Sequence, residues 1–207
     1  MRHSLSVSLV GVLALAGAIS APSFAQSNDS AYVRVFDDCT HPDPVAAGYN
    51  EEARLADCAG YEGWTVHTWV GPMPAPTFIA FSDRGVEAQW QEGPPNLDIG
   101  HQFGDVMEWR LDASGTPFAT ILRSIFTGFC SPGQYLTVTA LRSEGEVGGC
   151  QVAYIEAVDQ ANPNQMARDA ADYLAPDWEC GVDEPITFDA YGETDVMAVV
   201  ARRQAAQ

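Results

Sequence analysis

The stretch CQVAYIEAVDQANPNQMARDAADYLAPDWEC, from Cys150 to Cys180, decides the fold that we predict. Its first part, residues 150–157, is rich in β-forming side chains and would extend about 26 Å as a strand, at roughly 3.3 Å per residue. A helix of about 20 Å fits residues 163–175, at roughly 1.5 Å per residue. A helix that folds back along its own strand returns the chain to the start of that strand. We therefore expect a disulfide between Cys150 and Cys180.

The helix over 163–175 carries its own boundary signals. Asn162 suits the N-cap, Pro163 suits the first helical position, and Gln165 three residues after the cap resembles a capping box. Small and apolar side chains line one side and polar side chains the other, which is typical of a helix that packs closely on a sheet. Pro176 ends it.

The remaining cysteines are assigned from this first pair. In an oxidising compartment, an odd number of cysteines predicts bridges with one thiol left over. Elimination and proximity pair Cys39 with Cys58. Each bridge closes a loop of about 20 to 30 residues, worth on the order of 3 kcal/mol in the entropic model. Cys130 is then the free thiol, which we expect as a small buried apolar side chain, because a catalytic thiolate needs a cation nearby.

The N-terminal residues predict export. A basic start at 1–3 and an apolar run over 5–19 precede small residues up to Ala25, a pattern typical of a cleaved secretory signal. The apolar run is shorter than the roughly 20 residues that span a membrane. We expect a signal peptide over 1–25 and one α+β domain over 26–207, soluble and periplasmic or secreted. An uncleaved N-terminal anchor is the alternative.

The chain is strongly acidic, with a formal net charge of −18 from 10 basic and 28 acidic residues. Without Arg2 the balance is 9 − 28 = −19. Such a surface repels nucleic acid and anionic lipid headgroups, so neither is expected as a partner. It attracts cationic proteins, cationic peptides or divalent ions; simple solubility is the other explanation.

Turn signals divide the rest of the chain into short segments, mostly strands. The pattern predicts an antiparallel β-meander of seven to eight strands, able to curl toward a barrel, with one C-terminal helix packed on the sheet. A long polar excursion interrupts it at 37–63. The expected elements are an edge strand at 31–36, one or two helical turns at 51–57, strands at 64–70, 77–82 and 86–90, a hairpin over 105–126 turning at 112–115, a second pair around 144–149, and a last strand at 195–203.

A possible charged cluster follows from the first strand of the 105–126 hairpin. Apolar residues at 107, 109 and 111 alternate with Glu108 and Arg110, which indicates one wet face. Glu108, Arg110 and Arg123 are therefore expected as surface pairs, each worth under about 1 kcal/mol. Burial of the three together would instead suggest a site.

The segments EWRLDASGTPFATILR, LTVTAL and GGCQVAYIEAVDQANPNQMARDAADYLAPDWEC resemble an uncharacterised family of exported proteins of Gram-negative bacteria. The likeness covers roughly 108–180 and is looser around Cys39 and Cys58. It implies an exported location and this cysteine framework, and no activity. Many members have His where this chain has Gln151, so the resemblance implies no shared metal site there.

No catalytic, cofactor or metal residue is assigned, because the chain lacks a G-x-S-x-G elbow, a P-loop, an H-E-x-x-H motif and a dinucleotide fingerprint. Two acidic groups are interpreted as a polar loop and a solvated tail, with weak divalent-ion binding as the alternative. They are Asp37, Asp38, His41 and Asp43, and then Asp183, Glu184, Asp189, Glu193 and Asp195.

The leading hypothesis is a non-enzymatic periplasmic binding or interaction protein whose acidic surface captures a cationic protein or peptide. One alternative is a small-ligand carrier with an apolar pocket inside the curled sheet. Another is a hydrolase with dispersed catalytic groups, which needs His67 or His101 beside a carboxylate or Cys130. The sequence does not indicate an oligomeric state.

Overall fold

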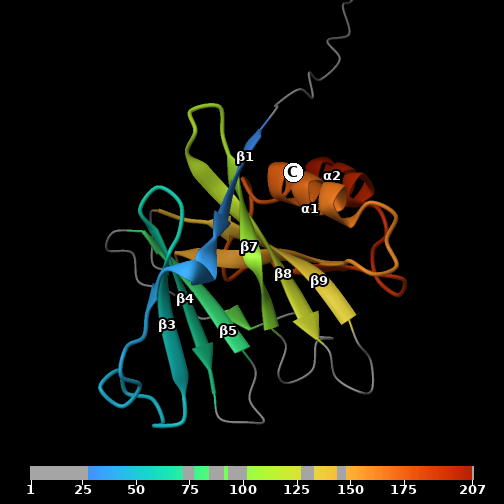
Figure 1. Cartoon of the computed structure of the whole chain (residues 1–207). Helices are drawn as coiled ribbons and strands as arrows, with labels where there is room; N and C mark the ends of the chain where they lie inside the picture. The colour runs from blue at the N-terminus through green and yellow to red at the C-terminus, as the bar shows by residue number, and fades with distance from the viewer. Residues whose placement is uncertain are drawn as a thin grey trace, which may run out of the picture.

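The computed structural model describes residues 28–71, 77–83, 91–92, 102–126, 133–143 and 148–206. These residues form two β-sheets and two α-helices, an α+β arrangement as predicted (Figure 1). The finer prediction is wrong, because eleven strands divide between two open sheets in place of one meander of seven to eight. The expected signal peptide, the strand at 86–90, His101 and Cys130 lie outside the described residues.

The larger sheet has six strands in the order β1-β7-β8-β9-β10-β11. All neighbours are antiparallel except β10 and β11, which makes the sheet mixed. The expected edge strand is β1, and the expected hairpin turns between β7 and β8, where Gly115 has φ +84°. The bounds are β1 Asp29–Arg34, β7 Gln102–Leu111, β8 Pro117–Phe126, β9 Gly133–Leu141, β10 Gly149–Glu156 and β11 Ile186–Phe188.

The smaller sheet has five antiparallel strands in sequence order. Its bounds are β2 Cys39–Thr40, β3 Arg54–Ala59, β4 Trp64–Val70, β5 Thr77–Asp83 and β6 Gln91–Glu92, and the short 3-10 turn η1 (Val35–Asp37) leads into it from β1. The helical turns expected at 51–57 are wrong. Pairing with β4 satisfies the backbone of β3, and Cys58 is fully buried, so tertiary pairing outweighs local helix propensity.

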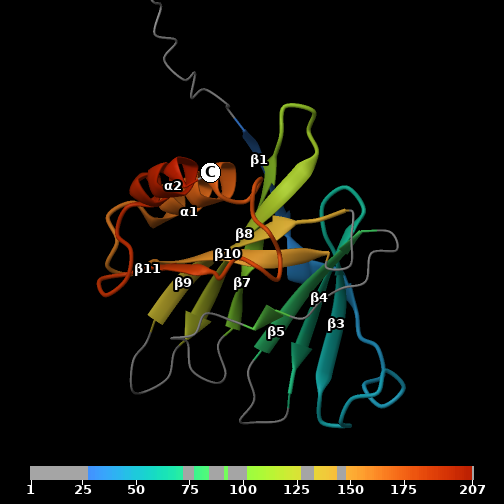
Figure 2. The same ribbon diagram turned by 180° about the vertical axis from the view of Figure 1, so that it is seen from behind.

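The two sheets and the two helices form layers, with the six-stranded sheet in the middle (Figures 1 and 2). Strands β7 to β9 bury side chains on both faces, so they need cover on both sides. Met107 and Trp109 fill the core between the sheets. Ala119 and Ile121 belong to the core under the helices α1 (Pro163–Tyr173) and α2 (Val196–Ala205).

The strand expected at 195–203 is wrong, because this segment forms α2. The side chain of Asp195 caps its first turn, accepting from the backbone N–H three residues on at 3.1 Å. Val196, Val199 and Val200 follow helical spacing and are all buried. Burial of that face outweighs the β preference of branched side chains, and the described residues form two α-helices where one was expected.

Helix α1 lies where it was predicted, but two of its three start signals differ. Pro163 is in its first turn, whereas Asn162 makes no side-chain cap hydrogen bond. Gln165 bonds Asp169 at 2.8 Å within the helix, so no capping box forms. Within the described part of the chain, no helix is long and apolar enough to cross a membrane.

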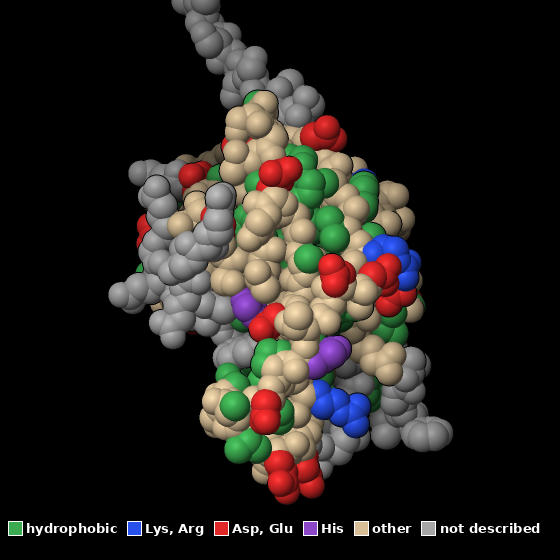
Figure 3. All heavy atoms as spheres, turned by 60° about the vertical axis from the view of Figure 1, so that its left-hand side comes forward, with side chains coloured by type: hydrophobic (Ala, Val, Ile, Leu, Met, Phe, Trp, Pro, Cys, Tyr) green, Lys and Arg blue, Asp and Glu red, His purple; other side chains and the backbone are tan. Residues whose placement is uncertain are grey.

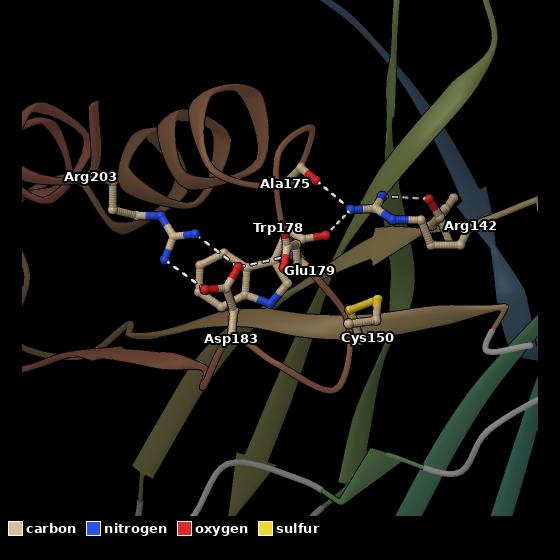
Figure 4. Close-up of a disulfide and its surroundings, with 9 residues drawn as sticks. Arg142, Cys150, Ala175, Trp178, Glu179, Asp183 and Arg203 are labelled. Carbon is tan, nitrogen blue, oxygen red and sulfur yellow. Dashed lines mark hydrogen bonds and ion pairs between the residues drawn. A yellow bond between two sulfur atoms is a disulfide. The ribbon is translucent and has the colours of Figure 1, made fainter. Parts of the chain in front are cut away.

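The structure contains both expected disulfides. Cys150 and Cys180 have Cα atoms 5.6 Å apart, and Cys39 and Cys58, opposite one another on β2 and β3, have Cα atoms 4.1 Å apart. The chain therefore runs along β10, folds back through α1 and brings Cys180 to the start of β10, as predicted (Figure 4).

Two arginines hold the segment after α1 close to the Cys150–Cys180 disulfide, here called the clasp (Figure 4). Arg142 donates to the backbone carbonyls of Ala175 (2.8 Å) and Trp178 (2.6 Å), which helps satisfy acceptors where the helix ends. Arg203 of α2 lies over the Trp178 ring at 4.7 Å and pairs with Asp183 at 2.8 Å. The clasp is thus tied to α2 as well as to the sheet.

Candidate functional site

Glu108 and Arg110 are buried under α1, so the expected wet face of β7 is wrong. The Arg110 guanidinium makes a two-pronged contact with the Asp172 carboxylate, with Nε at 2.9 Å and a terminal nitrogen at 2.7 Å. It also donates to the Ser30 hydroxyl and to the Asn28 carbonyl of the N-terminal strand region. Helix α1 covers this face of β7, and the alternation of polar and apolar residues along the strand did not indicate that cover.

Glu108 completes this buried network. Its carboxylate accepts from the Ser30 hydroxyl at 2.6 Å and from Arg168 of α1 at 2.8 Å. Arg110 lies 3.5 Å from the same carboxylate. The two carboxylates and two guanidinium groups balance in charge and bond one another across β1, β7 and α1. We conclude that the network stabilises the fold.

Arg123, the third expected member, does not join the network. It donates to Gln134 at 2.9 Å and to Asn164 at 3.4 Å. The helix partners Arg168 and Asp172 belong to the polar side of the predicted helix. Helix periodicity shows which residues share a side, but it does not show which layer covers that side.

The network predicts a loss of stability in acid. Burial alone would raise the pKa of Glu108, but hydrogen bonds from Arg168 and Ser30 and the charges of Arg168 and Arg110 outweigh burial and hold this pKa below its ordinary value of 4.5. Stability from a depressed carboxyl pKa is present above the ordinary value and is lost as pH falls through the folded value. We expect the free energy of unfolding to fall as the pH drops below 4.5.

Denaturant unfolding at a series of pH values measures this effect, with Glu108→Gln as the comparison. The variant should depend less steeply on pH in that range, because it has no carboxyl group to protonate at this position. Equal pH dependence of the two proteins would contradict the assignment.

A groove of about 530 Å³ lies between the β3–β4 turn and the β7–β8 turn. The carboxylates of Glu62 and Asp83 and the aromatic side chains of Tyr61 and Trp64 line it. None of its described lining residues is basic. Hydroxyl groups come from Ser114, Thr116 and Ser143.

Local sequence explains how these groups reach the groove. Glu62 and Gly63 both have positive φ (50° and 88°), which is the two-residue hairpin turn that suits the twist of antiparallel strands. The turn places Glu62 at one side of the groove. Asp83 lies opposite Trp64 on β5, so both side chains point to the same side of the sheet.

Most arginine side chains in the described ranges bond to acceptors of the same chain. Five of the described arginines pair with carboxylates, and Arg123 and Arg142 donate to uncharged acceptors. Arg54 is exposed at the start of β3. The shortest pair of each arginine is Arg34–Asp37, Arg110–Asp172, Arg168–Glu108, Arg202–Glu193 and Arg203–Asp183, and longer pairs join Arg34 to Asp105 and Arg110 to Glu108.

The other sequence hypotheses meet different outcomes. Among the described residues, no group of three or more His, Cys, Asp or Glu side chains is placed to hold a metal ion.

The cavity between the sheets, lined in part by Ile79, Phe81 and Ser124, measures about 10 Å³. A carrier pocket for a drug-sized ligand measures roughly 300–1,000 Å³, so this one holds no such ligand.

His67 meets the first condition of the hydrolase hypothesis, because it lies beside a carboxylate. Its Nδ1 is 2.7 Å from Asp57 Oδ1, on the face of β3 and β4 that points away from the other sheet. Asp57 was missed because its segment was expected to be helical.

Comparison of the chain with protein-family models, with curated proteins and with solved structures finds no match.

Proposed function

We propose that this chain is an exported binding protein that captures a cationic protein or peptide in the groove between the β3–β4 and β7–β8 turns. The single observation that carries the proposal is the lining of that groove: two carboxylates, two aromatic rings and three hydroxyl groups, with no basic side chain among its described residues. Two disulfides and the resemblance to exported proteins support a periplasmic or secreted location.

The groove suits a lysine or arginine side chain. Carboxylates bind ammonium and guanidinium groups through charge-assisted hydrogen bonds, and hydroxyl oxygens add acceptors. The partly exposed ring of Tyr61 offers apolar contact to the methylene stem and cation–π contact to the charged end, and the edge of the buried Trp64 adds apolar surface to the groove wall. The net charge of −18 speeds the approach of a basic partner from a distance.

A lysine- and arginine-rich peptide should bind this protein at low salt, and its affinity should fall as salt is added, because screening shortens the range of charge attraction. The double variant Glu62→Gln/Asp83→Asn should weaken binding roughly tenfold, from about 0.7 kcal/mol for each carboxylate removed. Titration calorimetry at several salt concentrations measures both effects.

The matched control is Glu51→Gln/Glu52→Gln, which removes the same charge from the exposed loop before β3. If the groove is the site, the control changes affinity by less than the groove variant does. Equal effects of the two variants would remove the groove from the proposal. Failure to retain any basic peptide at low salt would end the proposed function.

A further inference from the structure

A hydrogen-bonded row of three side chains crosses the five-stranded sheet on its outer face. His67 Nδ1 lies 2.7 Å from Asp57 Oδ1, and His67 Nε2 lies 2.7 Å from Ser82 Oγ. The carboxylate only accepts, so Nδ1 carries the proton and donates to Asp57. In the neutral ring Nε2 then accepts, and the Ser82 hydroxyl donates to it.

Strand register builds this row. Asp57 on β3 lies directly opposite His67 on β4, and Ser82 on β5 lies two residues beyond the partner of His67. Side chains alternate between faces, so all three point to the side away from the core between the sheets. Three adjacent strands, and not a flexible loop, hold the groups in line.

We propose that Ser82 is an activated nucleophile and that this face cleaves acyl esters. Ser82 Oγ attacks the ester carbonyl carbon while its proton passes to His67 Nε2, and the carbonyl electron pair moves to oxygen. That pair returns as the bond to the alcohol breaks, and the alcohol leaves with the proton from Nε2. Water repeats the sequence on the acyl-serine, which yields the free acid and restores Ser82. Asp57 orients the imidazole and stabilises its protonated form.

The same face offers contact for an apolar group of the ester. Trp69, two residues from His67 on β4, packs its ring at a tilt against Phe78 across on β5, with ring centroids 4.7 Å apart, and against Tyr49, with ring centroids 6.0 Å apart. All three rings are partly exposed. Two histidine side chains reach the surface in the space-filling view, and an acidic side chain lies beside the upper one (Figure 3). An ester with an aromatic or alkyl group beside the reacting carbonyl fits this arrangement.

The test uses p-nitrophenyl acetate and a fluorophosphonate with the purified exported chain. The activated aryl ester has a good leaving group, so it reports nucleophile activation directly. We expect the fluorophosphonate to modify Ser82, found by peptide mass spectrometry, and Ser82→Ala to lose both the label and the hydrolysis. His67→Ala and Asp57→Asn should slow hydrolysis by about 10²–10⁴-fold, the usual contribution of a positioned general base.

Thr65→Ala is the matched control. Thr65 lies directly opposite Ser82, carries a hydroxyl on the same face and is outside the row of hydrogen bonds. It should leave labelling and hydrolysis unchanged. An unlabelled Ser82, with wild type and Ser82→Ala equally inactive and equally folded by circular dichroism, would overturn the proposal and leave the row as a cross-strand hydrogen-bond ladder. Glu62 and Asp83 line the groove on the other side of this sheet, so their variants test peptide binding separately.

Discussion

Arg110→Met should lower the free energy of unfolding by about 3 to 5 kcal/mol, the usual cost of leaving one partner of a buried ion pair uncompensated. Arg110 is 5% exposed and its partner Asp172 shows 14% of its side chain. Methionine keeps most of the apolar stem and removes every donor. Urea unfolding followed by circular dichroism measures the change.

Arg123 provides the control for this experiment, because the sequence analysis placed it in the same expected cluster as Arg110. Arg123→Met loses hydrogen bonds to Gln134 and Asn164 but strands no buried carboxylate, so its cost should stay under about 1 kcal/mol. The double variant Arg110→Met/Asp172→Leu should recover part of the loss, because it removes both charges. Equal costs for Arg110→Met and Arg123→Met would contradict the buried network.

The double variant Cys150→Ala/Cys180→Ala should lose about 3 to 4 kcal/mol, since the bridge closes a long loop in the unfolded chain and restricts it. The two cysteines are 30 positions apart. Thermal unfolding with and without a reducing agent measures the effect. The loss should be larger than for the pair Cys39→Ala/Cys58→Ala, which are 19 positions apart, because loop entropy grows with length.

Reduction of the wild type should destabilise it by at least as much as the Cys150→Ala/Cys180→Ala variant. A variant as stable as the wild type, with the same response to reductant, would show that the loop after α1 is held by Arg142 and Arg203 without help from the bridge.

Elements with strong local signals were predictable. The hairpin turning at 112–115, the strand at 64–70 and the start of α1 at Pro163 depend on turn residues and periodicity within a short stretch. The segments at 51–57 and 195–203 were wrong for a shared reason. Their local propensity pointed one way, and partners distant in sequence outweighed it in deciding between helix and strand.

The candidate sites were less predictable than the elements. His67 could be singled out because histidine is rare in this chain, but nothing in the sequence connects it with Asp57 and Ser82. Their proximity depends on the register of three strands, and a shift of one residue would turn the set to the opposite face. The groove likewise joins turns from two different sheets.

By itself, the sequence determined the α+β class, the acidic charge and the pairing of the cysteines, because composition, periodicity and the length of a strand followed by a returning helix are local quantities. Only the tertiary structure decided that Glu108 and Arg110 lie under α1, that the strands divide into two sheets, and that Asp57, His67 and Ser82 form a row. Each of these features depends on which sheet or helix packs against which. That packing is decided by the burial of apolar area across the whole chain.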